Sequence, residues 1–136
     1  MFEMKAVKAR VTRGLPHTAN VVAADNSGAR ILRIISVKNA KTVKGRKPSA
    51  GVGDFVMCSV VEGKPDMRKQ VVPAIIVRQR MPYRRRDGMR VRFEDNAAVV
   101  LKDEMGNPKG TMIKGPIAKE IVGRWPVVAK LAKVVV

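Results

Sequence analysis

The sequence is short of the residues on which catalytic and metal chemistry most often depends. It has 136 residues with one cysteine, Cys58, and one histidine, His17. One cysteine cannot form an intramolecular disulfide, and these two residues cannot complete a four-ligand zinc site of the finger type. His17 lies in a Gly-Leu-Pro-His-Thr segment with no serine motif nearby, so a Ser-His-Asp nucleophile is poorly supported. We expect no catalytic residues, no metal site and no cofactor.

Long apolar runs are missing as well. The longest, Val71 to Val77, has seven residues and contains a proline, whereas a membrane-spanning helix needs about 20. The N-terminal residues are basic but lack the apolar core of a signal peptide. Because Cys58 lies in an apolar run, we interpret it as a buried side chain in a reducing compartment. We therefore expect a protein of a reducing compartment without a membrane-spanning helix; the family resemblance described below implies that the compartment is the cytoplasm.

Acidic residues are scarce relative to basic ones. Lys and Arg number 28 against 11 Asp and Glu, which gives a formal net charge of +17. Like charge at this density weakens a compact state, so such a chain usually has a polyanionic partner. Nucleic acid is the favoured partner, and an anionic membrane surface is the weaker alternative. Hydrophobic residues make up 46% of the chain, which is enough for a folded core.

Aromatic residues make up only 4% of the chain, which argues against a protein that stacks unpaired bases on exposed rings. Phe55 and Phe93 fall in strand patterns and are predicted core residues. Tyr83 lies beside arginines and could either stack on a base or pack internally. Glu94 and Asp95 are neighbours after a strand pattern, so they would point to opposite faces and not form a catalytic carboxylate pair. We expect contacts with the backbone and shape of structured RNA.

The sequence does contain a series of short β-strand patterns separated by turn residues. Residues 20–24 and 29–38 flank the turn formers Asp-Asn-Ser-Gly and are predicted to pair as a hairpin. Further strands are predicted over 55–61, 69–80, 89–94 and 97–102, and short helices over 117–122 and 127–133. Short strands at this close spacing indicate a small β-barrel. We divide the single domain into a basic N-terminal tail (1–17), a barrel (18–114) and a C-terminal helical segment (115–136).

The segment from Arg78 to Arg92 contains seven arginines and one acid, Asp87. If its flanking strands pair, it projects from the barrel as a basic hairpin. Guanidinium groups stay charged and match phosphate oxygens with paired hydrogen bonds, so we expect this segment to hold an RNA backbone; the alternative is a solvated loop. The predicted RNA contacts are Arg84, Arg85 and Arg86, flanked by Arg78, Arg80, Arg90 and Arg92, with Lys44, Arg46 and Lys47 in a second loop. The predicted turn glycines are Gly28, Gly88 and Gly110.

The run PAIIVRQRMPYRRRDGMRVRFEDNAAVVL, from Pro73 to Leu101, resembles the signature of the universal large-subunit ribosomal protein fourteen family. The segments ADNSGAR (24–30), GVGD (51–54) and GNPKGTMIKGPIAKEI (106–121) are similar to the same family. The stretch GKPDMRKQVVPAI is similar to its archaeal and eukaryotic branch. The resemblance spans roughly residues 18–136.

The resemblance implies a mainly β fold, a five-stranded antiparallel barrel with a short C-terminal helical part. It also implies a structural, non-enzymatic constituent of the large ribosomal subunit that lies at the intersubunit face. The implied partners are large-subunit rRNA, large-subunit ribosomal proteins three and twenty-four, small-subunit rRNA through a bridge, and the anti-association initiation factor six during maturation.

Three other function classes remain open from the residues alone. A free RNA-binding factor would share the charge, although the shortage of aromatics counts against it. A magnesium-dependent nuclease would need a carboxylate cluster, which the spacing of the acids does not suggest. A basic protein of membrane surfaces would need a longer amphipathic helix than the sequence predicts.

Overall fold

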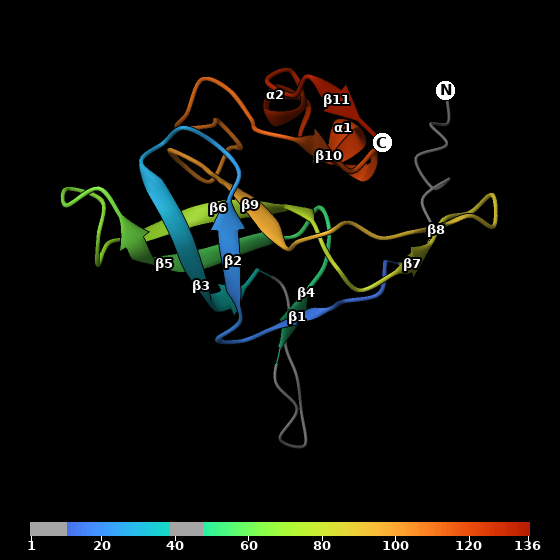
Figure 1. Cartoon of the computed structure of the whole chain (residues 1–136), viewed down its shortest axis with the longest axis horizontal. Helices are drawn as coiled ribbons and strands as arrows, with labels where there is room; N and C mark the ends of the chain where they lie inside the picture. Colours follow the sequence, from blue (N-terminus) through green and yellow to red (C-terminus); the bar gives the residue numbers. More distant parts are fainter. Residues whose placement is uncertain (1–10, 39–47) are drawn as a thin grey trace.

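The computed structural model describes residues 11–38 and 48–136. Five of its strands close into a barrel, in the order β2 (Asn20–Ala23), β3 (Ala29–Val37), β5 (Phe55–Gly63), β6 (Val71–Arg78) and β9 (Ala97–Val100) (Figure 1). The predicted hairpin is confirmed, because β2 and β3 pair antiparallel around the Asp-Asn-Ser-Gly turn. The predicted five-stranded barrel is confirmed as well.

One pairing of the barrel differs from the expected antiparallel arrangement. The pairs β2–β3, β3–β5, β5–β6 and β6–β9 are antiparallel. The pair that closes the barrel, β2 with β9, is parallel, with Val22 opposite Ala97 and Ala23 opposite Ala98. A parallel closure requires a long connection between the two strands, and here the rest of the barrel provides it.

Short elements extend the barrel at its ends. The pair of β1 (Leu15–Pro16) with β4 (Ser49–Ala50) packs the buried Leu15 against the barrel. A two-stranded ribbon, β7 (Tyr83–Arg84) with β8 (Arg90–Val91), projects away from it (Figure 1). The C-terminal segment contains β10 (Pro116–Ile117), α1 (Glu120–Arg124), α2 (Pro126–Ala129) and β11 (Val134–Val135), with β11 parallel to β10. None of the helices in the described ranges has the length and hydropathy needed to cross a bilayer.

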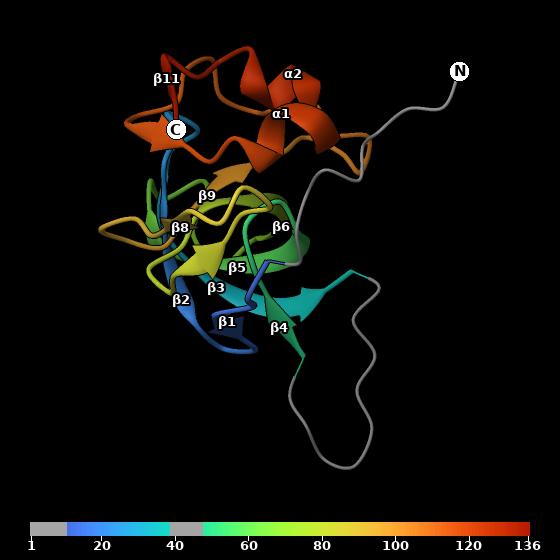
Figure 2. The same ribbon diagram turned by 90° about the vertical axis from the view of Figure 1, so that its right-hand side faces the viewer.

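The core has two layers, and strand alternation divides residues between them. Inside the barrel lie Ile34, Ala74 and Ile76, all fully buried. Ile75 and Val77 point to the opposite face of β6 and pack in a second cluster with residues of the C-terminal segment, Ile117, Ile121 and Val128 among them. The strand β9 is buried on both faces for this reason. Figure 2 shows the C-terminal segment as a separate layer over the barrel. Truncating Ile76 to Ala would cost about 2–5 kcal/mol of stability.

Candidate nucleic-acid interface

The arginine-rich segment forms a hairpin with a defined tip. Arg85 N–H donates to the Met89 carbonyl at 2.8 Å, and Gly88 N–H donates to the Arg85 carbonyl at 2.9 Å. The Asp87 carboxylate accepts from Met89 N–H at 2.9 Å, the local bond by which aspartate stabilises a turn. Gly88 has φ of 93°, a left-handed conformation that glycine adopts without strain. The turn therefore holds its flanking arginines on a defined ribbon.

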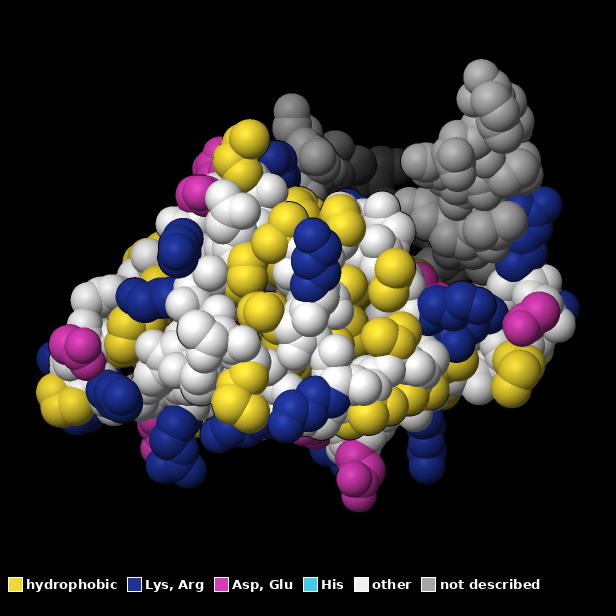
Figure 3. Space-filling model, turned by 90° about the horizontal axis from the view of Figure 1, so that it is seen from above, with side chains coloured by type: hydrophobic (Ala, Val, Ile, Leu, Met, Phe, Trp, Pro, Cys, Tyr) yellow, Lys and Arg dark blue, Asp and Glu magenta, His cyan; other side chains and the backbone are white. Residues whose placement is uncertain are grey.

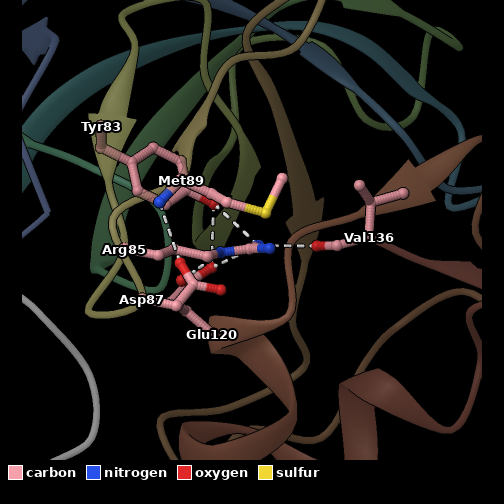
Figure 4. A network of polar contacts seen from close by, with 6 residues as sticks. All are labelled: Tyr83, Arg85, Asp87, Met89, Glu120 and Val136. Atoms are coloured by element: carbon pink, nitrogen blue, oxygen red, sulfur yellow. Dashed lines mark hydrogen bonds and ion pairs between the residues drawn. The ribbon is translucent and has the colours of Figure 1, made fainter.

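Arg85 is not directed to solvent, although its neighbours are. Its Nε lies 3.0 Å from Oε2 of Glu120, and its Nη2 lies 3.2 Å from Oε1 of the same carboxylate (Figure 4). Nη2 also donates to the Val136 carbonyl at 2.6 Å, while Tyr83 Oη donates to Glu120 at 2.9 Å. This network, which we call the Arg85 latch, joins the hairpin to α1 and to the residue after β11.

The latch shifts the pKa values of Tyr83 and Arg85. Burial raises the pKa of the Tyr83 hydroxyl, and its hydrogen bond to the Glu120 carboxylate raises that pKa further. For Arg85, burial lowers the pKa of the guanidinium, but the hydrogen bond and the charge of Glu120 outweigh burial and raise the pKa overall. The phenol thus stays protonated and the arginine stays charged, which is the combination of donors that the Glu120 carboxylate needs.

Arg78 is also used inside the protein. Its side chain is 9% exposed, and its Nε lies 2.9 Å from Oδ1 of Asp95. Its Nη1 donates to the carbonyls of Lys114 and Pro116 at 2.9 and 3.1 Å. Gly115 leaves room for this contact, because a Cβ there would collide with Nη1 of Arg78. Arg78 is one of the RNA contacts predicted from the sequence, whereas its geometry makes it a tie between β6 and the C-terminal segment.

Two polar residues at the base of the hairpin have structural roles that were not predicted from the sequence. The fully buried Gln79 accepts from Val52 N–H at 2.8 Å and donates to the carbonyls of Thr12 and Met81 at 2.7 and 2.8 Å. The Asn96 amide oxygen accepts from Arg80 N–H at 2.7 Å. A polar Gln after an apolar strand and before an arginine run was the available signal. Together these bonds fix where the hairpin leaves the barrel.

The remaining predicted RNA contacts on the hairpin are exposed. They are Arg80, Arg84, Arg86, Arg90 and Arg92. Asp87 at the tip is the acid among them, so the ribbon presents a surplus of positive charge. Their contact with RNA stays a prediction. The predicted second loop, with Lys44, Arg46 and Lys47, lies outside the described residues.

The turn between β2 and β3 is hydrogen-bonded to the loop that follows β9. The Asn26 amide oxygen accepts from Thr111 N–H at 2.8 Å, and Asn26 Nδ2 donates to Thr111 Oγ1 at 2.8 Å. Gly28 has φ of 105°, in the left-handed region. Gly110 serves a different purpose, because a Cβ there would lie 2.5 Å from Oδ1 of Asn26. The segments ADNSGAR and GNPKGT, distant in sequence, form one clasp.

The aromatic side chains offer no exposed platform for bases in the described part of the chain. Tyr83 is 1% exposed, which decides its role in favour of packing. Phe55 is buried as predicted, and its ring centroid lies 6.0 Å from that of Trp125. Trp125 Nε1 donates to the Gly53 carbonyl at 2.8 Å. Phe93 is partly buried against the outer cluster.

The acidic side chains of the described ranges do not form a metal-binding cluster. Within residues 11–38 and 48–136, no three His, Cys, Asp or Glu side chains gather as metal ligands. Three of the acids form ion pairs instead: Asp95 with Arg78, Glu120 with Arg85, and Asp54 with Arg124 at 3.3 Å. These ion pairs tie the hairpin and the C-terminal segment to the barrel.

Comparison with known proteins gives one consistent family. The family described as ribosomal protein L14p/L23e matches residues 14–136. The chain is 54% identical to large ribosomal subunit protein uL14 of Methanococcus vannielii, over 97% of this chain and 99% of that protein. It is 50% identical to the proteins of that name from Nanoarchaeum equitans and Halobacterium salinarum, over 98% of this chain and all of each relative. The chain therefore belongs to the ribosomal protein L14p/L23e family.

Proposed function

We propose that this protein is a structural constituent of the large ribosomal subunit and that its basic hairpin holds rRNA phosphates. As a member of a ribosomal protein family it is structural and not an enzyme, and it works in the cytoplasmic ribosome as part of a ribonucleoprotein. The finer claim concerns the exposed arginines of the hairpin. They would contact the RNA backbone, while Arg78 and Arg85 keep the hairpin in place.

The observation that carries the proposal is that the arginines of the segment 78–92 differ in their surroundings. Two of them, Arg78 and Arg85, are tied to carboxylates and carbonyls of the C-terminal segment and of Asp95. Arg80, Arg84, Arg90 and Arg92 are exposed, and the acid of the hairpin, Asp87, bonds its own turn. A protein rarely fixes so much like charge on a projecting ribbon without an anionic partner. Arginines at fixed positions suit phosphates, which they bind with paired hydrogen bonds.

The C-terminal face supports a second part of the proposal, which is contact with other proteins. Exposed apolar side chains of this segment include Val122, Val127, Val134 and Val135. Figure 3 shows hydrophobic side chains gathered on this face, among scattered Lys and Arg. Apolar surface of this kind is commonly covered by a partner. We infer that the implied neighbours, large-subunit proteins three and twenty-four and initiation factor six, would meet this face, and that bridging to small-subunit rRNA would use a basic surface.

The test is sedimentation of tagged variants on sucrose gradients at low and high salt. One variant carries Arg84→Gln, Arg90→Gln and Arg92→Gln. The control loses the same charge away from the hairpin, through Arg33→Gln, Lys38→Gln and Lys102→Gln, which are all exposed. We expect the hairpin variant to leave the large subunit at a lower salt concentration than the control, because each lost phosphate contact weakens binding. The control should stay bound.

Two results would contradict the proposal. If the hairpin variant stays with the large subunit as firmly as the control, the hairpin is not the RNA contact. If the unmodified protein itself leaves ribosomes at modest salt, it is a free RNA-binding factor and not an integral constituent.

A further inference from the structure

The tip of the basic hairpin contains the one Asp-Gly pair of the sequence, formed by Asp87 and Gly88, and the sequence has no Asn-Gly pair. An aspartate followed by glycine is open to attack on its own side chain, because glycine has no Cβ to shield the backbone nitrogen. Both residues are exposed. A Cβ built on Gly88 would meet no heavy atom of the described residues within 4 Å, its chain neighbours aside.

The closed turn engages both groups that would react. Gly88 N–H donates to the Arg85 carbonyl at 2.9 Å, and the Asp87 carboxylate accepts from Met89 N–H at 2.9 Å. For the nitrogen of Gly88 to reach Cγ of Asp87, these hydrogen bonds must break and the backbone of the tip must rotate. The reaction therefore needs an opened tip, and its rate follows how often the tip opens.

The ribbon that carries the tip depends on Arg85 to stay closed. Tyr83 anchors the base of the ribbon in the core, but β7 and β8 pair at only two positions, and a two-stranded hairpin is marginal by itself in water. Met89 is 65% exposed and packs little at the tip. The backbone N–H of Arg85 donates to the Met89 carbonyl at 2.8 Å, while its side chain pairs with Glu120 on α1 (Figure 4). One residue thus joins the tip to the C-terminal segment.

We propose that Asp87 and Gly88 form a site of spontaneous isoaspartate formation, and that the Arg85 latch controls its rate by holding the tip closed. In the first step the nitrogen of Gly88 bonds to Cγ of the protonated Asp87 carboxyl, whose hydroxyl leaves with the amide proton as water. In the second step water cleaves the bond between the Asp87 carbonyl carbon and the Gly88 nitrogen. The water released is taken up again, so the isomerisation needs no other reactant.

The product differs from the original tip in backbone length and in the position of its charge. The backbone gains one carbon between Asp87 and Gly88, and the free carboxylate moves to Cα of the aspartate. The hydrogen bonds that close the turn do not fit this longer backbone, so the arginines on either side lose their fixed spacing. The reaction itself does not depend on what the hairpin binds.

The experiment ages the full-length protein for weeks at neutral pH and physiological temperature. An isoaspartyl methyltransferase with labelled S-adenosylmethionine measures total isoaspartate, and peptide mapping with electron-transfer fragmentation assigns it to each aspartate. Asp66 and Asp103 are exposed but are not followed by glycine, so they report any reaction that does not need the Asp-Gly pair. Protein unfolded in urea gives the rate of the open chain.

Four variants separate the latch from the chemistry. Glu120→Gln removes the carboxylate that pairs with Arg85, and Tyr83→Phe removes only the hydroxyl that donates to this carboxylate. Glu104→Gln is the matched control, because it removes the same charge from an exposed position. Gly88→Asn keeps the aspartate and tolerates the left-handed backbone, but it places a Cβ beside the attacking nitrogen. Circular dichroism melting checks that the variants fold.

We expect isoaspartate at Asp87 in the unmodified protein and at least about fivefold faster conversion in Glu120→Gln, because its tip opens more often. Tyr83→Phe should give a smaller rise, Glu104→Gln no rise, and Gly88→Asn should lose most of the product. Equal rates at Asp87, Asp66 and Asp103 would overturn the inference, as would a rate at Asp87 that Glu120→Gln leaves unchanged. The inference also fails if Asp87 stays unmodified over a period in which the unfolded protein converts.

Discussion

Arg85 and Glu120 form a two-bond ion pair that joins the basic hairpin to helix α1. Both carboxylate oxygens of Glu120 accept from the guanidinium, at 3.0 and 3.2 Å. The side chains are 18% and 14% exposed, so the pair is largely shielded from water and salt. One acid therefore sets the direction of the ribbon that carries the exposed arginines.

The first prediction is that Glu120→Gln weakens RNA binding although it makes the protein more positive. The neutral amide cannot pair with the Arg85 guanidinium, so the hairpin loses its tie to α1. We expect the free energy of unfolding to fall by about 1–3 kcal/mol, the cost of losing hydrogen bonds to a charged group. Urea denaturation measures the stability, and titration with an rRNA fragment measures the affinity.

The matched control for this prediction is Glu104→Gln, which removes the same charge from an exposed position. It should leave stability unchanged and raise RNA affinity slightly, because only net charge has changed. If Glu120→Gln raises affinity as much as Glu104→Gln does, the Arg85 latch does not position the hairpin.

The second prediction separates two arginines that stand two residues apart. Arg78→Ala leaves the carbonyls of Lys114 and Pro116 without a donor, so it should cost about 1–3 kcal/mol of stability, while the loss of the pair with the 42% exposed Asp95 adds little. Arg80 is exposed, and Arg80→Ala should change stability by less than about 0.5 kcal/mol. Thermal and urea unfolding of the two variants provide the comparison. Equal losses of stability would refute the structural role given to Arg78.

The third prediction concerns pH and the Asp25 carboxyl. Burial raises its pKa above the ordinary 3.8, and hydrogen bonds from Ser27 and from Val100 N–H offset this only in part. An acid with a raised pKa holds its proton more tightly in the folded state, so its contribution to stability grows as pH falls through the folded pKa and is lost as pH rises. The unfolding free energy of the unmodified protein, minus that of Asp25→Asn, should therefore increase between about pH 7 and about pH 4. A difference that stays flat or decreases over this range would show that the carboxyl is not desolvated.

The fourth prediction is that Cys58 reacts only when the protein unfolds. Its side chain is fully buried, and burial raises the pKa of its thiol to about 12. Since the thiolate is the reactive form, an aromatic disulfide reagent at mildly alkaline pH should label the folded protein no faster than it unfolds globally. Stopped-flow labelling across urea concentrations measures this rate, with protein unfolded in urea as the reactive control. Fast labelling without denaturant would mean that β5 opens locally.

The strands of the barrel could be predicted because their signals are local. The β-branched run over β3 and the turn formers before it determine a hairpin over a few residues. The closing pair of β2 with β9 has no such signal, because pairing between distant segments leaves no pattern in either one. The sequence of β9 does indicate its burial, because a run of Ala-Ala-Val-Val without polar alternation is typical of a strand covered on both faces.

The hairpin was predictable as a unit, but the roles of its arginines were not. Arg78, Arg84 and Arg85 have the same side chain and lie in one basic run. What separates them is the position of Asp95, Glu120 and the carbonyls near Gly115, which only the folded chain brings close. The same holds for Tyr83, whose burial depends on the distant C-terminal segment.

The closure of the barrel also bears on how the protein is made. The β2–β9 pair that closes the barrel joins Val22 to Ala97. Pairings between residues so far apart in the sequence form slowly. During synthesis the nascent chain therefore emerges with the edges of β2 and β6 unpaired until β9 is complete. Unpaired edges invite contact with other chains, and here they belong to a chain that is strongly attracted to nucleic acid. Both edges are covered only once β9, which ends at Val100, has been added.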